Sequence, residues 1–394
     1  MAGSEPLSFG LTIDEELCSR CSLCVYTCPF EALTLLKGEL PEERKVEVDR
    51  EKCKLCGLCY TICPLDAITV QYYSMEDLLE MARQLCLKTG ERSLVVACKG
   101  SNPTDRSIEE KVGRRGIPVL RVPCAGRVPM DFYFRLLSEG VADRLHVFPC
   151  EEEFCRLKEG GKISFLKLDY LRSLLAELKV DGGIISLTKS VNKAKVNEAK
   201  CIGCGNCEHY CPYEAAMVRS PGIATIDEEK CMGCGICLAV CPNFAISLEG
   251  YEQETMAENL AKLAEAAKRA VRGGVKPVLV FYCQWAYTPK PPEGDGSGIC
   301  FMELPCAGRL DPLHVIQALN LGFEGVLVLA CKEDMCNFEE AGAKRAEINL
   351  SSVKRALSQL GLDGKVEISF VHPKYPREAE EALSSFLNKI KGER

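Results

Sequence analysis

Four copies of one cysteine motif constrain this chain more than any other feature of its sequence. Each copy reads Cys-x2-Cys-x2-Cys-x3-Cys-Pro, and the copies begin at Cys18, Cys53, Cys201 and Cys231. They account for 16 of the 26 cysteines in a chain of 394 residues. So many closely spaced thiols indicate either a disulfide framework or metal ligation, and the compartment and the spacing decide between them.

The rest of the sequence favours metal. The residues before Cys18 contain neither the basic segment nor the apolar run of a signal peptide, and we expect a cytoplasmic protein, in which thiols stay reduced. No stretch approaches about 18 consecutive apolar residues, so we expect no membrane span. The net charge of −7 is spread along the chain and provides no basic patch for nucleic acid.

The spacing within the motif is that of bacterial two-cluster ferredoxins, in which the cysteine before the proline is directed to the other cluster of the pair. A zinc ribbon would explain pairs of Cys-x2-Cys, but it would not explain a third cysteine and a Cys-Pro four times over. The sequence therefore predicts four [4Fe–4S] clusters with crossed ligands. Their ligand sets are Cys18, Cys21, Cys24 and Cys63; Cys53, Cys56, Cys59 and Cys28; Cys201, Cys204, Cys207 and Cys241; and Cys231, Cys234, Cys237 and Cys211.

A second cysteine set shows that the chain is a duplication. Cys98, Cys124, Cys150 and Cys155 recur about 180 residues later as Cys283, Cys306, Cys331 and Cys336. The string Pro-Cys-Ala-Gly-Arg occurs at 123–127 and again at 305–309. Each half therefore combines a ferredoxin-like part with a second part.

The hydrophobic pattern predicts the fold of the second part. Amphipathic helices are expected at Ser74–Lys88 and Thr255–Arg272. Short apolar runs, typical of buried parallel strands, follow at Ser93–Ala97, Ile117–Val122 and Leu145–Phe148, and again at Pro277–Tyr282, Ile299–Leu304 and Gly325–Ala330. A cysteine follows each run closely, so we expect three cysteines side by side at the carboxyl edge of each sheet and the fourth on the next loop.

The predicted fold class is α+β and α/β. Two bacterial-ferredoxin-like 2[4Fe–4S] domains, at 8–73 and 191–250, alternate with two small parallel-sheet α/β cluster domains, at 74–190 and 251–394. From the residues alone, the second cysteine set remains open. It could hold a [2Fe–2S] or [4Fe–4S] cluster or zinc, form a redox-active Cys-x4-Cys dithiol, or consist partly of ordinary buried cysteines.

The second part resembles a known family. A strand ending in cysteine (Phe281–Trp285), then Cys-x-Gly-Arg (Pro305–Arg309), then Cys-x4-Cys (Ala330–Cys336) is similar to the methyl-viologen-reducing hydrogenase delta-subunit family. The resemblance covers about Pro277–Lys389 and, more loosely, Ser93–Cys155. It implies a [2Fe–2S] cluster at Cys283, Cys306, Cys331 and Cys336, and by duplication another at Cys98, Cys124, Cys150 and Cys155.

Several positions depart from the family pattern. Ala286 and Ser101 stand where the family usually has another cysteine, and Lys332–Met335 and Glu151–Phe154 replace its His-x-Gly-Asp. The first copy also lacks the tryptophan and is expected to be truncated after Cys155. These differences concern the type of cluster more than its presence.

A few further residues are candidates for the sites. Arg127 and Arg309 each follow a candidate ligand by three residues, and we assign them as cofactor-binding residues that screen cluster charge or donate to sulfur; a solvated or capping role is the alternative. Cys86 and Cys300 have no repeated partner and are expected to be packing residues. His209 lies among ligands with a full cysteine set and is not expected to coordinate metal. Glu151–Glu153 is expected to be a solvated acidic run.

The resemblance implies an electron-transfer subunit of an anaerobe with four [4Fe–4S] and two [2Fe–2S] clusters. No nucleotide-binding motif is present, so flavin or nicotinamide chemistry would belong to a partner subunit. The expected partners are a hydrogenase or formate dehydrogenase and a flavoprotein like the flavin-containing subunit of heterodisulfide reductase, including electron-bifurcating complexes. Two alternatives remain: an enzyme that reduces a disulfide or low-potential substrate at its Cys-x4-Cys sites, and a donor of clusters or electrons for maturation of another metalloenzyme.

Overall fold

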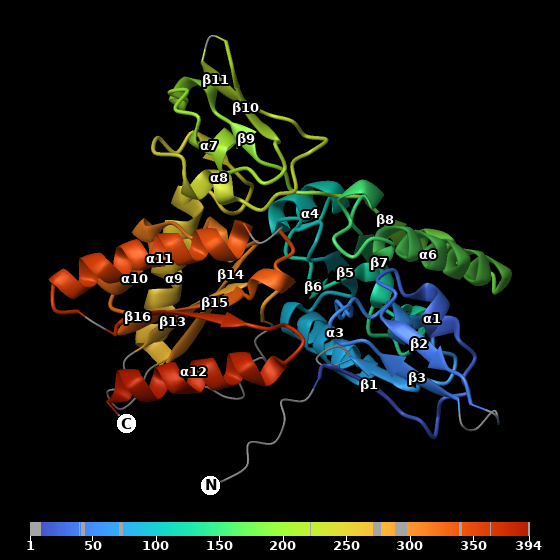
Figure 1. The fold of residues 1–394 in the computed structure, drawn as a ribbon. Coiled ribbons are helices and arrows are strands. Elements are labelled where there is room, and N and C mark those ends of the chain that lie inside the picture. Colours follow the sequence, from blue (N-terminus) through green and yellow to red (C-terminus); the bar gives the residue numbers. More distant parts are fainter. Residues whose placement is uncertain are drawn as a thin grey trace, which may run out of the picture. The chain divides into compact units, whose positions relative to one another are not determined.

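The chain forms two compact units, which we call the first unit (Phe9–Asn192) and the second unit (within Lys193–Arg394). Their boundary lies beside the expected junction between the two copies. The computed structural model describes residues 9–38, 40, 44–70, 74–220, 222–270, 277–287, 298–338, 341–362 and 364–392. Figure 1 shows both units, each with a small β-hairpin part and a larger part built on a four-stranded sheet.

The ferredoxin-like part has the same plan in both units: two antiparallel strand pairs and two short helices. In the first unit, β1 (Leu11–Ile13) pairs with β4 (Ile68–Val70), β2 (Leu33–Leu36) pairs with β3 (Lys45–Val48), and the helices are α1 (Leu23–Thr27) and α2 (Leu58–Ile62). In the second unit, β9 (Lys195–Val196) pairs with β12 (Ile246–Ser247), β10 (Ala216–Arg219) pairs with β11 (Ile223–Ile226), and the helices are α7 (Asn206–His209) and α8 (Ile236–Ala239).

The backbone of the cysteine motifs explains these short helices. In all four motifs, the residues on either side of the second cysteine have left-handed φ values; in the second motif these are Leu55 (φ 49°) and Gly57 (φ 77°). Such turns curl the chain so that backbone N–H groups point into the concave side of the loop. The residue after the second cysteine then caps the short helix that carries the third cysteine.

The larger part of each unit is a parallel four-stranded sheet. The strand order is β6-β5-β7-β8 in the first unit and β14-β13-β15-β16 in the second. The strands are β5 (Ser93–Cys98), β6 (Val119–Val122), β7 (Arg144–Phe148), β8 (Ile185–Leu187), β13 (Val278–Cys283), β14 (Ile299–Leu304), β15 (Gly325–Cys331) and β16 (Val366–Val371). The first strand lies inside the sheet, so the second strand is added on one side of it and the third on the other. The strand order therefore reverses between the first and third strands, which is where open α/β sheets bind ligands.

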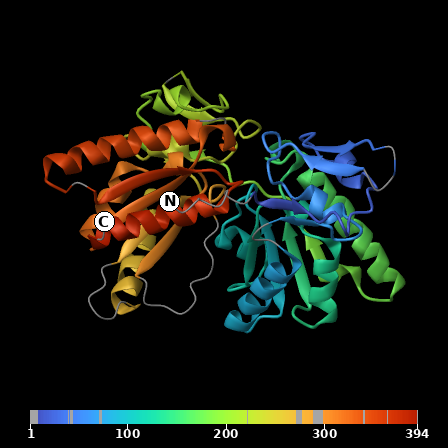
Figure 2. The same cartoon turned by 60° about the horizontal axis from the view of Figure 1, so that its bottom comes forward.

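Helices cover these sheets. The first unit has α3 (Met75–Thr89), α4 (Asp105–Val112), α5 (Met130–Ser138) and α6 (Gly160–Glu177); the second has α9 (Gln253–Ala270), α10 (Pro312–Asn320), α11 (Ala341–Gln359) and α12 (Pro376–Lys391). Figures 1 and 2 show α11 and α12 on opposite faces of the second sheet. Helix α3 begins at a capping box in which Ser74 and Asp77 satisfy each other's backbone N–H groups.

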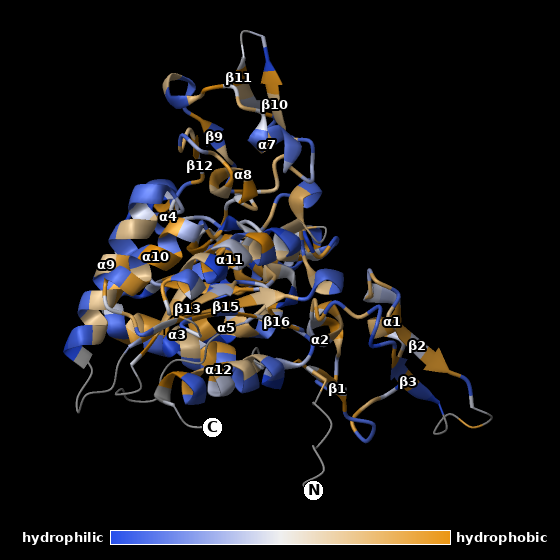
Figure 3. Cartoon of the chain, turned by 60° about the vertical axis from the view of Figure 1, so that its left-hand side comes forward, coloured by the Kyte–Doolittle hydropathy of each residue, from blue (hydrophilic) through white to orange (hydrophobic). Residues whose placement is uncertain are grey.

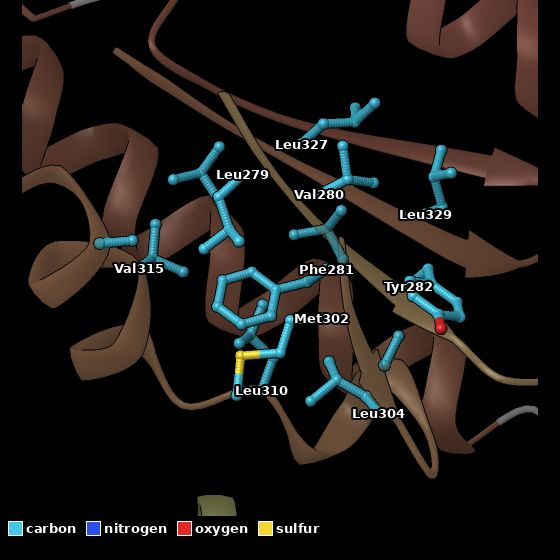
Figure 4. Close-up of a cluster of buried hydrophobic side chains, with 14 of the residues drawn as sticks. Leu279, Val280, Phe281, Tyr282, Met302, Leu304, Leu310, Val315, Leu327 and Leu329 are labelled. Carbon is cyan, nitrogen blue, oxygen red and sulfur yellow. The ribbon is translucent and has the colours of Figure 1, made fainter. Parts of the chain in front are cut away.

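Apolar strands and amphipathic helices form the core of each larger part. In Figure 3 the central strands β13 and β15 are hydrophobic along much of their length, whereas α12 alternates between hydrophobic and hydrophilic residues. Figure 4 shows Phe281 of β13 beside Met302 and Leu310. Phe281 is fully buried, and burying a side chain of this kind contributes about 1.5–3 kcal/mol to folding. The core therefore holds the carboxyl edge of the sheet rigidly.

The predicted helices and strands agree with the structure within one or two residues at most ends. Residues 271 and 272, at the end of the expected Thr255–Arg272 helix, lie outside the described residues. The first copy is shorter than the second, as expected, but the truncation does not begin at Cys155: α6 and β8 match α11 and β16, and no helix in the described residues between β8 and β9 corresponds to α12. The sequence did not predict β8, which is only three residues long, or β16. No helix in the described residues is long and apolar enough to cross a membrane.

Candidate metal centres

The structure brings cysteines from different motifs together in the crossed manner that the sequence predicts. In the first unit, Cys28 lies within electrostatic range of Cys56 and Cys59. In the second unit, Cys211 lies near Cys237, and Cys241 lies near Cys207. The remaining set brings Cys18, Cys21 and Cys24 together. The place of Cys63 in that set, and the metal-ligand role of all four sets, stay predictions.

The chemistry of these sets fits iron–sulfur clusters. All 26 cysteines are free thiols, and burial raises the pKa of Cys24 and Cys56 to about 11 each. Crowded, buried thiols need a positive partner to become thiolates, and a bound metal deprotonates a coordinating thiol outright.

Backbone N–H groups already point at several of the sulfurs. Those of Ala32, Ala215 and Ala245 lie 3.2–3.3 Å from the Sγ atoms of the Cys-Pro cysteines. Such N–H···S bonds stabilise negative charge on cluster sulfur.

Within the described residues, no three His, Cys, Asp or Glu side chains converge as they would on a single metal ion.

Each ferredoxin-like part has one cysteine set near solvent and one that is buried. We call the sets that contain Cys21 and Cys204 the outer sets, because both of these thiols are exposed. We call the sets that contain Cys56 and Cys234 the inner sets, because both of these thiols are buried. A cluster in an outer set is therefore accessible to another protein, whereas a cluster in an inner set is shielded from water.

The second cysteine set of each unit gathers at the carboxyl edge of the sheet, and we call it the strand-end set. Cys98 ends β5 and Cys150 follows β7, so these two flank the point where the strand order reverses, and their Sγ atoms are 3.3 Å apart. The equivalent sulfurs of Cys283 and Cys331 are 3.7 Å apart. The other two members, which lie close to these, are Cys124 and Cys155 in the first unit and Cys306 and Cys336 in the second.

In each strand-end set, hydrogen bonds from neighbouring thiols lower the pKa of the first cysteine, Cys98 or Cys283, and that of the fourth. A hydrogen bond from Cys150, with backbone N–H groups of Gly161 and Leu157, lowers the pKa of Cys155 to about 7. A hydrogen bond from Cys306, with N–H groups at the start of α11, lowers the pKa of Cys336 to about 6. Both cysteines lie where a long helix begins, so its N-terminal N–H groups stabilise the thiolate.

Glycine is required where that helix meets the sulfurs. A β-carbon at Gly160 would collide with Sγ of Cys124, and one at Gly342 would collide with Sγ of Cys306. The glycine of the Cys-Ala-Gly-Arg string packs on the same turn, because a β-carbon at Gly126 would collide with the carbonyl oxygen of Gly160. These glycines let the helix start lie directly against the strand-end set.

Within each unit, the inner set packs against the strand-end set. In the first unit, Cys56 lies in one apolar cluster with Cys124 and Cys155. In the second, Cys234 lies in one cluster with Cys306, with Cys336 packed against it. The two kinds of site are therefore direct neighbours inside a water-poor region.

The arginines of the Cys-Ala-Gly-Arg strings reach the inner sets. Arg127 and Arg309 are 3% and 1% exposed, and a β-carbon at Gly57 or Gly235 would lie within 3 Å of one of them. Arg309 donates from Nε to the carbonyl oxygen of Tyr251 over 3.2 Å. Burial lowers the pKa of Arg309 to about 10. Each arginine follows a strand-end cysteine in sequence but places its charge beside an inner set.

Sequence reasoning missed a partly buried lysine in this region, whose Nζ atom is enclosed by three acceptors. The Nζ atom of Lys167 donates to Thr61 Oγ1 over 2.9 Å and to the carbonyl oxygens of Gly126 and Val128 over 2.6 Å each. Burial lowers the pKa of Lys167 to about 7. In the sequence, Lys167 is an ordinary residue of an amphipathic helix, and its only signal is that the equivalent residue of the duplicate is Asn349.

The remaining predicted residues have ordinary surroundings. Cys86 is buried in the core under α3, and Cys300 is half-buried against the second core, as expected for packing residues. His209 forms an edge contact with the ring of Tyr210. Glu152 and Glu153 are exposed, as expected for a solvated run.

The fold and the cysteine sets define a multi-cluster iron–sulfur protein, and comparison with known proteins agrees. A 4Fe-4S dicluster domain model matches residues 11–70 and 194–248. The chain belongs to the family of the methyl-viologen-reducing hydrogenase delta subunit, whose model matches residues 107–201 and 278–392, just over half of the chain. The resemblance seen in the sequence is thereby confirmed.

Individual relatives come from two kinds of complex. The chain is 36% identical over 179 residues to the A-type subunit of the ferredoxin:CoB-CoM heterodisulfide reductase of Methanosarcina mazei, covering 44% of this chain and 22% of that protein. It is 32% identical over 101 residues to the D-type iron-sulfur subunit of the vhu F420-non-reducing hydrogenase of Methanopyrus kandleri, covering 24% of this chain and 76% of that protein. The chain thus spans about a fifth of the length of the reductase subunit, and it is an iron–sulfur electron-transfer protein related to both subunits.

Proposed function

We propose that this chain is an electron-relay subunit that carries four [4Fe–4S] clusters in its outer and inner sets and two [2Fe–2S] clusters in its strand-end sets. The observation that supports this proposal is the packing of each inner set against the strand-end set of the same unit. Clusters bound in such sites supply one-electron uptake and release. Two clusters that are direct neighbours in a water-poor region are well placed to exchange electrons.

The outer and inner sets differ in their exposure to solvent, and we assign them different roles in electron transfer. The exposed thiols of Cys21 and Cys204 put the outer sets within reach of a partner protein. The buried inner sets, with Arg127 and Arg309 beside them, hold their clusters away from water, and a nearby cation favours the more negative, reduced state. In each unit, electrons would pass between the outer set, the inner set and the strand-end set.

We infer the partners from the relatives. The relatives are named as subunits of a heterodisulfide reductase and of hydrogenases. We propose that this chain relays electrons between a hydrogenase or formate dehydrogenase and a flavoprotein that resembles the A-type subunit of heterodisulfide reductase. Co-purification of native partners under anaerobic conditions tests this assignment.

The cluster count is tested by analysing the anaerobically purified chain. We expect about 20 Fe per chain and uptake of about six electrons from dithionite. In addition, Cys241→Ser should abolish the signal of the outer cluster in the second unit, whereas Cys300→Ser should retain every signal. Eight or fewer Fe per chain with stoichiometric zinc would overturn the proposal.

One observation favours a second function, reduction of a substrate at the Cys-x4-Cys sites. The lowered pKa values of Cys155 and Cys336, about 7 and about 6, are those of nucleophilic thiolates. This function requires the isolated chain to reduce a disulfide with reduced viologen as electron donor. Absence of turnover with a full complement of clusters would leave the relay as the function.

A further inference from the structure

The two strand-end sets have the same cysteines but different charges beside them. Lys99, directly after Cys98, corresponds to Gln284, directly after Cys283. Arg156, directly after Cys155, corresponds to Asn337. Lys167 of α6 corresponds to Asn349 of α11. At three equivalent positions, a basic residue in the first unit is thus replaced by a neutral amide in the second.

Lys167 and its replacement, Asn349, occupy equivalent positions in the structure and bond to equivalent backbone groups. Its Nζ atom has three acceptors, and only a protonated amine has three hydrogens to donate to them. Asn349 makes the corresponding bond, from Nδ2 to the carbonyl oxygen of Leu310 over 2.8 Å. Leu310 is the equivalent of Val128. The same pocket in the two units therefore contains a cation in one and an amide in the other.

A second basic residue of the first unit is buried more deeply than Lys167. Lys99 is only 4% exposed. In the second unit, Gln284 is equally buried and donates from Nε2 to the carbonyl oxygen of Pro305 over 3.4 Å. Charges in a low-dielectric region act on a neighbouring site far more strongly than charges in water.

Acidic residues near the first strand-end set carry charge of the opposite sign and so offset these basic residues in part, but they act from solvent. Glu151–Glu153 occupies the positions of Lys332, Glu333 and Asp334. The side chain of Glu152 is 52% exposed and lies 3.8 Å from Nζ of Lys189. In the second unit, Lys332 pairs with Glu378. Water and these ion pairs screen the surface charges. The second unit has a buried lysine of its own, Lys374 after β16, but the position of Lys167 is occupied there by the neutral Asn349. This last difference carries the comparison of the two sites.

We propose that the strand-end site of the first unit has the higher reduction potential of the two, and that Lys167 is a main residue that raises it. This inference rests on the proposed function, namely that both sites hold a cluster. Reduction adds one electron, and one negative charge, to a site, which a buried cation nearby stabilises. When one electron is shared between the sites, the second-unit site is left oxidised and the first-unit site is reduced.

The test is a redox titration of the loaded, full-length chain, followed by electron paramagnetic resonance. Cys124→Ser and Cys306→Ser assign the signals of the two strand-end sites. We expect the first-unit site to be favoured at least tenfold for the electron, which is about 59 mV for a one-electron couple. Lys167→Asn should lower the midpoint of the first-unit signal and leave the other unchanged.

Two further variants control the result. Lys162→Asn removes a lysine from the same helix, but its side chain is 61% exposed, and it should not move the midpoint. In the second unit, Asn349→Lys combined with Ala239→Thr rebuilds the lysine pocket and should raise the second midpoint. This gain-of-charge variant tests the inference even if Lys167→Asn does not fold.

Three results would overturn the inference: equal midpoints in the unmodified chain, a higher midpoint at the second-unit site, or a shift no larger in Lys167→Asn than in Lys162→Asn. The proposed function fails separately, through low iron content, before any midpoint is measured. A fully loaded chain with the reversed order of midpoints would retain the relay and remove only the assignment of the higher potential.

Discussion

The two units place their sulfurs alike but surround them with different side chains. In both, glycine at the start of a long helix admits the strand-end sulfurs, and an arginine reaches the inner set. Around this shared frame, Trp285 packs against the cluster that contains Cys234 and Cys306 of the second unit, where the first unit has Gly100. The basic residues beside the first strand-end set differ as well. Backbone geometry therefore fixes where the clusters bind, whereas the neighbouring side chains are free to make the two copies unequal.

The shared frame can be broken at the glycines, where we expect the largest effect. Gly160→Ala and Gly342→Ala each put a β-carbon where a cysteine sulfur lies, so each should abolish cluster binding at the strand-end site of its own unit. Iron should fall by the content of one site, about 2 Fe of about 20, with loss of one signal in electron paramagnetic resonance.

Gly182→Ala is the matched control, because its new β-carbon would have its nearest neighbour at 3.4 Å, an ordinary contact. It should retain all the iron. If Gly160→Ala lost its cluster while Gly342→Ala kept one with an unchanged spectrum, the two units would not share the same frame.

Much of this frame could be predicted from the sequence, because cysteine spacing and repetition are strong signals. The crossed pairing of Cys28 with the second motif follows from the spacing, and the gathering of Cys98 and Cys150 follows from strands that end at one edge. The destination of Arg127 could not be predicted, because a position three residues after Cys124 does not show that the side chain reaches Gly57. Short strands such as β8 carry too few residues for a periodic pattern.

The contact between Lys167 and Thr61 also predicts a difference in stability between the two units. Thr61 accepts from Lys167, and the second unit has Ala239 at the equivalent position. Thr61→Ala leaves the partly buried ammonium of Lys167 with one acceptor fewer and should lower the apparent free energy of unfolding by about 1–3 kcal/mol. Chemical unfolding under anaerobic conditions measures the change.

The double variant tells whether the pocket acts as a unit. In the Lys167→Asn background, Thr61→Ala should cost less, because the first unit then has the same pair of residues as the second. A coupling energy of about 0.5–3 kcal/mol is expected for side chains in contact. Strictly additive effects would mean that Lys167 and Thr61 do not depend on each other.

The smallest effect at neutral pH is expected at a buried histidine that distinguishes the two units. His314 of α10 is fully buried, neither ring nitrogen has a hydrogen-bond partner among the described residues, and its equivalent in α5 is Phe132. Burial, with repulsion from Arg309, lowers the pKa of His314 to about 3. The unfolded chain therefore binds this proton more readily than the folded chain, and stability falls as the pH drops below about 6.5.

His314→Phe tests this pH dependence. At pH 7 the titration of His314 contributes almost nothing to the free energy of unfolding, but at pH 5 the substitution should remove a destabilisation of about 2 kcal/mol. The denaturant concentration at the unfolding midpoint should therefore fall less between pH 7 and pH 5 in the variant than in the unmodified chain. The reciprocal Phe132→His variant should introduce the same pH dependence into the first unit. An unchanged pH slope in His314→Phe would mean that His314 is not held neutral in the folded chain, and this difference between the two units would then have no consequence for stability.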